Sequence, residues 1–229
     1  LCHGRANHSI CYFNSKWNLG DRMTGIYANS IKDQTGTRQL ASDSGSAWSW
    51  GSGLPSGSIV QLQSTQYTTN TSMTSVGTST DYVICSGTAG SGTEILNVNI
   101  TPRISGSKIW LQGMWCGEFS AKEDVYASMF FFYRNAVKLA NTQGSPGARQ
   151  VGIQTPAINY HEDDSTTSES IYYQYFDIHG ISAGTQITYK MGVTVNNGGT
   201  IFIGGVVDDT SHGYVTWGIS SIVAIEIAP

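Results

Sequence analysis

The sequence has few charged residues. Only 12% of its 229 residues are Asp, Glu, Lys or Arg, which is about half the fraction found in an average soluble domain. Long surface helices held by Glu–Lys pairs are therefore not expected. The charges that are present sum to −4 at neutral pH, so the basic surplus with which nucleic-acid binders neutralise phosphates is missing. We expect no nucleic-acid partner.

Long apolar runs and the short motifs of common enzymes are also absent. No stretch approaches the roughly 18 consecutive apolar residues of a membrane-spanning helix. The sequence contains no nucleophile elbow, phosphate-binding loop, dinucleotide fingerprint or His-Glu-x-x-His motif. The cysteines Cys2, Cys11, Cys85 and Cys116 form no Cys-x-x-Cys pair, so no zinc-binding spacing arises. We expect no membrane insertion, no metal or other cofactor and no catalysis.

Small polar residues and β-forming residues make up what is present. Glycine, serine and threonine together account for 78 residues, and the bulky residues are mainly Ile, Val, Tyr and Phe. This mixture is typical of strands joined by polar turns. Apolar and polar residues alternate over residues 94–102, 108–119 and 185–195, which is the period of a half-buried strand. The sequence predicts an all-β fold, a sandwich or barrel of roughly nine or ten strands.

Alternation also assigns side chains to the two faces of the predicted strands. Leu96, Val98 and Ile100 share the face expected to point inward. The longer strand predicted at 108–119 is assigned to two faces in the same way. The inward set is Ile109, Leu111, Gly113, Trp115, Gly117 and Phe119, and the outward set is Lys108, Gln112 and Glu118.

The segment 124–134 allows two interpretations. Val125, Met129 and Phe132 fall at helical spacing, whereas the aromatic run at 130–133 favours a strand. We favour the strand. Its two faces would both be apolar, so the second face needs a cover, which another sheet or another subunit would supply. Tyr126, Phe130 and Phe132 are the candidate residues for an interface within a homotrimer.

Two loops carry candidate binding residues. The acidic and imidazole groups of the first loop suit a hard cation or sugar hydroxyls, and the second loop adds aromatic rings that would cover an apolar sugar face. The residues of both loops also commonly form solvated turns or close hairpins. The residues in question are His161, Asp163 and Asp164 in the first loop, and Asp208, Asp209, His212, Tyr214 and Trp217 in the second.

Composition divides the chain into three parts. Residues 1–22 precede the first methionine, Met23, and we interpret them as a leader that is not translated naturally or as a disordered extension. Residues 23–57 are poor in apolar side chains and include a run of Ser, Gly and Trp at 42–53. Such a segment cannot bury enough surface to fold alone, so it is predicted to be an extended stalk. Residues 58–229 form the predicted head domain.

Several short segments, taken in order, resemble the C-terminal domain of virion-associated proteins of marine tailed phages, especially cyanophages. Asn29–Thr37 is similar to the attachment segment that precedes this domain. Where that family has Arg-Asp, this sequence has Arg134-Asn135. The segments that carry the resemblance are Ile100-Thr101-Pro102, residues 105–109, 132–135, 175–177 and 182–190, and residues 220–227.

The resemblance implies a compact β-sandwich of jelly-roll type, assembled as a homotrimer like tumour necrosis factor-like heads. It further implies a place on the virion, at a tail-fibre tip or on the particle surface, with the stalk attached to other virion proteins. We therefore expect a non-catalytic protein that binds host-surface glycans through several weak contacts at once. The alternative is a purely architectural protein such as a capsid decoration. A polysaccharide depolymerase is the third and least favoured reading.

Overall fold

The computed structural model describes residues 54–74, 84, 94–120, 125, 128–139, 151–156, 167–194, 199–208, 213 and 215–229, and the backbone of five further short strands. The chain divides into two compact units, Leu1–Ser58 and Ile59–Pro229. This division falls within one residue of the point where the composition changes.

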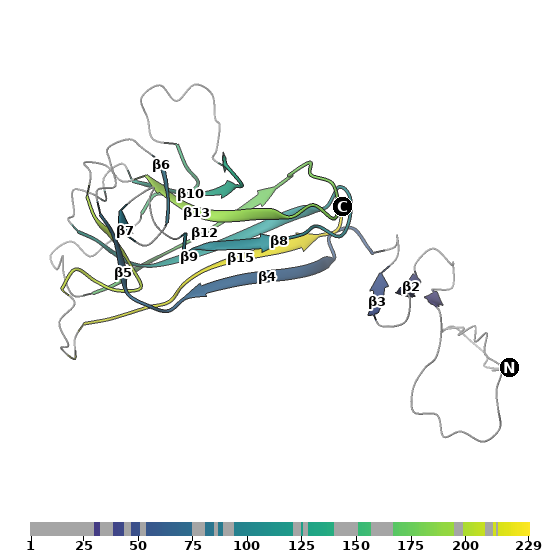
Figure 1. The fold of residues 1–229 in the computed structure, drawn as a ribbon, viewed down its shortest axis with the longest axis horizontal. Helices are drawn as coiled ribbons and strands as arrows, with labels where there is room; N and C mark the ends of the chain where they lie inside the picture. Colours follow the sequence, from purple (N-terminus) through teal and green to yellow (C-terminus); the bar gives the residue numbers. More distant parts are fainter. Residues whose placement is uncertain are drawn as a thin grey trace, which may run out of the picture. The chain divides into compact units, whose positions relative to one another are not determined.

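The first unit contains a small antiparallel sheet. Its strands are β1 (Ser30–Lys32), β2 (Gln39–Asp43) and β3 (Ala47–Trp50), in the order β1-β2-β3 (Figure 1). The composition of this region predicts an extended stalk, so the sheet is a difference from expectation. The hydrogen bonds between strands join backbone N–H and C=O groups, which almost every residue carries whatever its side chain. A segment poor in apolar side chains can therefore still form a sheet.

The second unit is built from two sheets (Figure 1). The larger sheet has the order β4-β15-β9-β14-β5-β7, with β12 paired to the other edge of β9, and only the β5–β7 pairing is parallel. Its strands are β4 (Ile59–Tyr67), β5 (Thr71–Thr74), β7 (Gly87–Thr88), β9 (Lys108–Phe119), β12 (Glu169–Asp177), β14 (Ile201–Ile203) and β15 (Ser220–Ile227).

The smaller sheet is antiparallel and is centred on β13. One edge of β13 pairs with β10, and the other edge pairs with β6 and β8 at different heights. The strands are β6 (Asp81–Val83), β8 (Asn97–Ile100), β10 (Met129–Arg134), β11 (Val137–Leu139) and β13 (Ile187–Thr194). The predicted all-β class is confirmed by the described residues.

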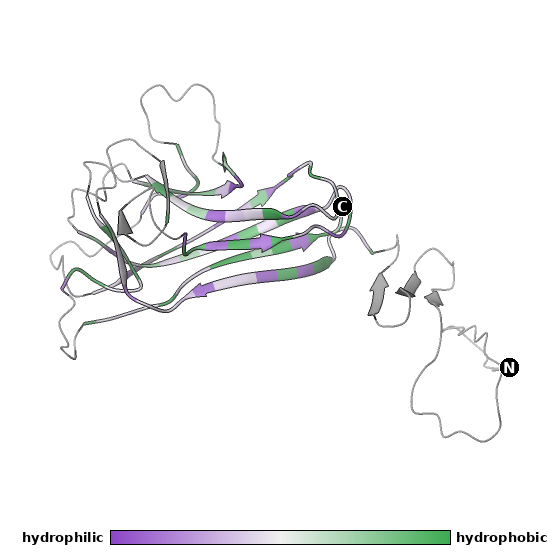
Figure 2. Cartoon of the chain, viewed as in Figure 1, coloured by the Kyte–Doolittle hydropathy of each residue, from purple (hydrophilic) through white to green (hydrophobic). Residues whose placement is uncertain are grey.

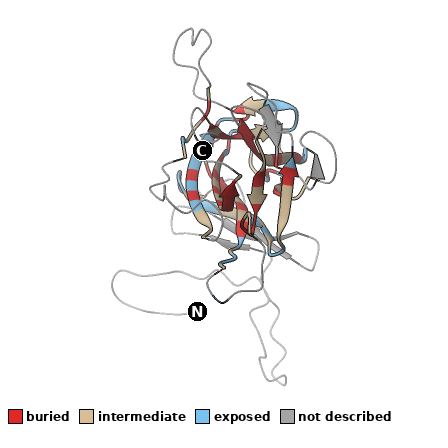
Figure 3. Ribbon diagram, turned by 90° about the vertical axis from the view of Figure 1, so that its left-hand side faces the viewer, coloured by how far each residue is buried: buried red, intermediate tan, exposed pale blue. Residues whose placement is uncertain are grey.

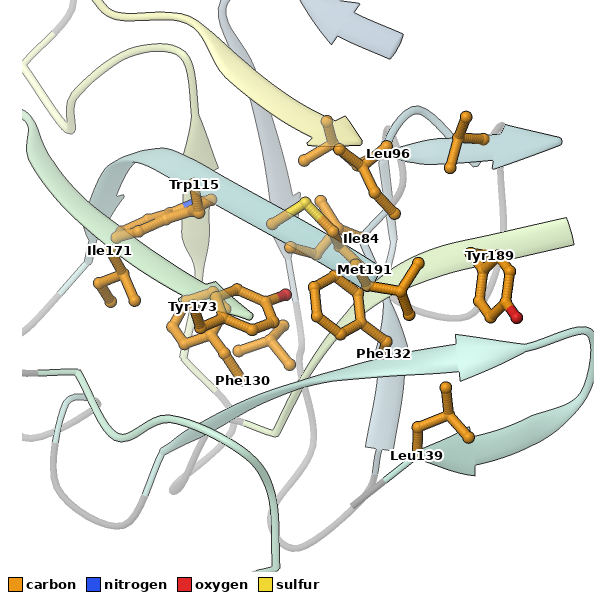
Figure 4. Close-up of a cluster of buried hydrophobic side chains, with 14 of the residues drawn as sticks. Ile84, Leu96, Trp115, Phe130, Phe132, Leu139, Ile171, Tyr173, Tyr189 and Met191 are labelled. Carbon is orange, nitrogen blue, oxygen red and sulfur yellow. The ribbon is translucent and has the colours of Figure 1, made fainter. Parts of the chain in front are cut away.

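The core lies between the inward faces of the two sheets. Figure 4 shows Trp115 and Tyr173 of the larger sheet among Phe130, Phe132 and Met191 of the smaller one, and all five side chains are buried. The Phe132 and Tyr173 rings have centroids 4.6 Å apart. Burial of large aromatic side chains contributes about 1.5–3 kcal/mol each, so this cluster holds the two sheets together.

The alternation in the sequence places most strand residues correctly. Leu96, Val98 and Ile100 are buried, and so is the whole predicted inward set of β9. Polar and apolar residues alternate along the strands in Figure 2, and buried and more exposed positions alternate in Figure 3. Glu118 is a correction: it was expected to face outward, but only 2% of it is exposed. Its Oε2 accepts a hydrogen bond of 2.6 Å from the N–H of Val207, in the segment after β14 that covers it.

The strand at 124–134 is confirmed from Met129 onward, while Val125 has helical backbone geometry. The expectation that Phe130 and Phe132 lie at a subunit interface is wrong, because both side chains are fully buried in the core of a single chain. Tyr126 lies outside the described residues. Phe131, on the other face of β10, is also fully buried. The Nζ atom of Lys138 lies 4.0 Å from its ring centroid, so the chain covers both faces of β10 itself.

Candidate functional site

The outer face of the larger sheet carries a row of apolar side chains. The ladders place Phe176 of β12 opposite Trp110 of β9, Trp110 opposite Ile225 of β15, and Ile225 opposite Leu62 of β4. Residues that lie opposite each other share one face of a sheet, and this face is opposite to the core because Leu111 points inward. Phe176 and Leu62 are 56% and 53% exposed. Between them, Trp110 is half-buried and Ile225 is only 6% exposed, so the row is open to solvent mainly at its two ends.

Two aromatic rings form a fixed platform within this row. The Trp110 and Phe176 rings are stacked, with centroids 5.5 Å apart and an angle of 10° between their planes. The Trp110 Nε1–H donates a hydrogen bond of 3.1 Å to Oε1 of Gln174. Stacking and the hydrogen bond restrict the rotamers of both side chains. A partner that docks on them consequently loses less conformational entropy.

The next two rows extend the surface without adding charge. They contain Tyr172, which is 56% exposed, and Met114 opposite it. The twelve positions, which we call the neutral face, are Leu62, Ser64, Gln66, Trp110, Gln112, Met114, Tyr172, Gln174, Phe176, Ser221, Val223 and Ile225. None of them is an Asp, Glu, Lys, Arg or His. A contiguous apolar and amide-rich face of this kind marks an interaction surface.

A hollow lies on the outer face of the smaller sheet. It has a volume of about 580 Å³, which falls within the range of ligand pockets. Lys190 in its wall forms an ion pair of 2.7 Å with Glu94. The lining residues are Glu94, Tyr133, Asn135, Ala136, Thr188 and Lys190.

Glu118, near the end of β9, and Glu169, the first residue of β12, are close enough to interact electrostatically. Burial, together with the negative charge of Glu118, raises the pKa of Glu169 from an ordinary value near 4.5 to about 7. Glu169 therefore holds a proton through much of the neutral range, whereas Glu118 accepts the Val207 N–H. Within the described part of the chain, no three His, Cys, Asp or Glu side chains are grouped so that they could hold a metal ion. The pair is a proton-binding feature.

Two buried carboxylates have structural roles. Asp177 accepts hydrogen bonds from Arg134 Nη1 (2.8 Å) and from the Tyr189 hydroxyl (2.7 Å), which joins β12 to β10 and β13. Burial and the hydrogen bond to Asp177 raise the pKa of Tyr189, so its hydroxyl stays protonated and donates. Glu226 is fully buried and accepts the backbone N–H groups of Arg103 and Ile104.

The loop residues predicted for binding are described only in part. Trp217 is 62% exposed and Asp208 is half-buried. The other candidates, His161, Asp163, Asp164, Asp209, His212 and Tyr214, lie outside the described residues. Cys116 has a free, half-buried thiol, with its Sγ 3.7 Å from the Ser168 hydroxyl oxygen, and Cys85 is not among the described residues.

The neutral face was missed by the sequence analysis. A signal for it exists in the sequence. Tyr172 and Phe176 are four positions apart in β12 and therefore share one face, and Trp110 occupies an outward position of β9. What the sequence lacks is the register that brings Phe176 against Trp110. No helix in the described ranges has the length and apolar character needed to cross a membrane. No model of a known protein family matches this chain, and comparison with curated proteins finds no significant relative.

Proposed function

We propose that this chain is a non-catalytic structural and adhesion protein of a phage virion. Its head would be a jelly-roll sandwich like that of tumour necrosis factor, assembled as a homotrimer through the neutral face, and the trimer would bind glycans on the host surface. The observation that carries the assembly is the neutral face. The resemblance of residues 100–227 to phage virion proteins supports the virion location and the threefold symmetry.

The composition of the neutral face favours a second copy as its partner. The face is uncharged, so two copies do not repel each other, and it combines apolar side chains with amides that can donate and accept. Its twelve positions cover about 300 Å² in projection, given strands about 4.8 Å apart. Ile178, which directly follows β12, is 76% exposed, and Ile59, the first residue of β4, is 63% exposed; both extend the face. For comparison, the largest apolar patch on a typical monomer covers about 300–600 Å² and is often a functional site.

Assembly would also strengthen glycan binding when each single contact is weak. Three heads on one support raise the effective concentration of each further binding site, so avidity can exceed a single affinity by about 10²–10⁴. The many Ser, Thr, Asn and Tyr side chains suit adaptable polar contacts of this kind.

Sedimentation of the full chain at micromolar concentration tests the assembly. The wild type is expected as a trimer, and Leu62→Glu as a monomer because a charge would be buried at the interface. Val137→Glu is the matched control, since Val137 is 55% exposed on the other sheet and is expected to leave the trimer intact. A monomeric wild type, or equal effects of both variants, would contradict assembly through this face.

Binding of the full chain to host cells and to a glycan array tests adhesion. A positive signal supports adhesion, whereas a blank array together with location on the capsid in cryo-electron micrographs of intact particles supports a decoration protein. Release of reducing ends from host polysaccharide would favour a depolymerase instead.

A further inference from the structure

A tyrosine and a lysine–glutamate pair border the hollow of about 580 Å³ on the outer face of the smaller sheet. Tyr133 of β10 is opposite Lys190 of β13 in the ladder, and opposite residues have Cβ atoms about 4.5–5.5 Å apart. The Lys190 Nζ atom lies 2.7 Å from Oε1 of Glu94. All three residues line the hollow, so an aromatic ring, an ammonium group and a carboxylate face the same space.

The described residues that line the hollow carry no net charge. The charged ones among them are Lys190 and Glu94, which neutralise each other. Lys138 is opposite Tyr133 on the other side, but its Nζ atom lies 4.0 Å from the Phe131 ring centroid and it does not line the hollow. Neither an anion nor a cation is favoured here by local charge, so the hollow suits a neutral ligand.

The charged pair can still form hydrogen bonds to a ligand. The Lys190 and Glu94 side chains are 20% and 39% exposed, so solvent reaches both. An ammonium group has three donors and a carboxylate about four lone-pair sites, and the hydrogen bond between the two uses one of each. Their bonded atoms are about as far apart as the oxygens of two hydroxyl groups on adjacent sugar carbons. One hydroxyl can therefore donate to Glu94 while its neighbour accepts from Lys190.

Hydrogen bonds fix two further polar side chains at the hollow. The Thr188 N–H donates to Oδ1 of Asn135 (3.0 Å), and the Asn135 N–H donates to the Thr188 carbonyl (2.7 Å). These bonds leave the Asn135 NH₂ group to donate elsewhere. The Thr188 hydroxyl donates to Oδ1 of Asn99 (2.6 Å), so its oxygen can still accept. Because both side chains are already held in place, a ligand loses less conformational entropy on binding them.

We propose that this hollow binds a neutral saccharide through two hydroxyl groups on adjacent carbons. The two hydroxyls bond to Glu94 and Lys190, the C–H face of the sugar ring packs against Tyr133, and a third hydroxyl accepts from the Asn135 amide. The inference rests on the proposed adhesion role and names the site and the chemical class of the glycan. An acidic sugar would bring its carboxylate beside that of Glu94, and a purely apolar ligand would desolvate both charges without new hydrogen bonds.

Saturation-transfer difference NMR with the full chain tests the chemical class, because it detects weak binding of single sugars. The probes are the methyl glycosides of galactose, glucose and mannose, each compared with the methyl glycoside of the corresponding uronic acid. We expect at least one neutral glycoside to bind and its uronic acid, which differs only in a carboxylate, to bind more weakly. Removal of one hydroxyl at a time is expected to weaken binding about tenfold at two adjacent carbons, since a hydrogen bond to a charged group is lost.

Charge variants then test the site. Glu94→Gln and Lys190→Gln are each expected to weaken binding of the neutral glycoside about fivefold, because a neutral amide forms weaker hydrogen bonds than an ionised group. Glu94→Gln also leaves the Lys190 charge without its carboxylate, so binding of the uronic acid is expected to rise. Lys108→Gln is the matched control for Lys190→Gln, because it makes the same change at an exposed position of the larger sheet and is expected to bind as the wild type does.

The aromatic ring is tested separately. Tyr133→Leu is expected to weaken binding about fivefold, since the flat surface for the sugar ring is lost. Tyr133→Phe keeps the ring and is expected to retain most of the binding. Thermal melting confirms that each variant is folded.

The outcomes separate this inference from the adhesion role. Equal losses in Lys108→Gln and Lys190→Gln, or uronic acids that bind the wild type as strongly as the neutral glycosides do, would overturn the neutral saccharide site. Wild-type protein that binds host glycans on the array but none of the neutral glycosides would also overturn it and leave adhesion standing. Wild-type protein that binds neither the glycosides nor any host glycan would overturn both.

Discussion

Gly192 lies directly opposite Phe131 in the β10–β13 ladder, and a Cβ atom on Gly192 would overlap the Phe131 ring. The ring therefore occupies the space that a side chain on β13 would fill. Tyr133 meets the same ring edge-on, with centroids 5.4 Å apart. This arrangement explains how one chain buries an aromatic residue on the outer face of β10 without help from a second subunit.

Gly192→Ala is expected to destabilise the protein by about 1–3 kcal/mol, the usual cost of overpacking a well-packed site. The added methyl group must displace either the Phe131 ring or the strand. Urea unfolding followed by near-ultraviolet circular dichroism measures the change. Gly213→Ala is the control, because a Cβ there meets nothing within 4 Å. Equal stabilities of the two variants would contradict the packing of Phe131 over Gly192.

The sequence predicted the fold class and most burial because both depend on local period. Leu96, Val98 and Ile100 alternate with polar residues, and a period of two places them on the core side whatever the strand pairs with. Phe130 and Phe132 could not be assigned in this way. Both faces of β10 are apolar, and only tertiary packing decides whether a second sheet, a glycine opposite or another chain covers each face.

The two surface sites could not be predicted because each depends on register between distant strands. Trp110 and Phe176 are 66 positions apart, and Tyr133 and Lys190 are 57 positions apart, yet each pair lies side by side in a ladder. Glu118 shows the same limit for charge, since its outward parity is correct for β9 but the segment at Val207 covers it.

Removal of the Asp177 carboxylate is expected to cost about 3 kcal/mol in Asp177→Ala, because Arg134 and the buried Tyr189 hydroxyl would both lose their acceptor. Tyr189→Phe removes a single donor and is expected to cost only about 1 kcal/mol. Denaturant unfolding at pH 7 gives both values. Glu94→Gln, which breaks the more exposed Lys190 pair, is expected to cost less than about 1 kcal/mol. A loss in Glu94→Gln as large as that in Asp177→Ala would contradict this ranking.

Glu169→Gln tests the raised pKa of Glu169. The folded pKa of about 7 exceeds the unfolded value near 4.5, so the folded state binds the proton more tightly, and wild-type stability falls as pH rises from about 4.5 to 7. The loss above pH 7 is of the order of 2 kcal/mol, with allowance for the solvent that reaches this half-buried side chain. The variant is expected to be more stable than the wild type at pH 8 and nearly equal to it at pH 4. Melting temperatures across this range check the prediction, and a difference that does not depend on pH would contradict it.

Glu226 stabilises the closure of the sandwich beside β8. Its Oε1 accepts the N–H groups of Arg103 (2.9 Å) and Ile104 (3.0 Å), and its Oε2 accepts from Nε2 of Gln61 (2.7 Å). The turn after β8 is thereby fixed to β15 and β4. Because each oxygen accepts from a donor, the NH₂ group of a glutamine would face an N–H wherever it was placed.

Glu226→Gln is consequently expected to cost about 2 kcal/mol despite its unchanged shape, since a buried donor is left without its acceptor. Hydrogen exchange is the sharper measurement, because the amides of Arg103 and Ile104 are expected to lose protection before the rest of the head does. Gln61→Ala leaves both of those backbone bonds in place and is expected to leave the exchange of the two amides nearly unchanged. Uniform loss of protection throughout the head in Glu226→Gln would show that the carboxylate contributes to global stability alone and does not hold this turn.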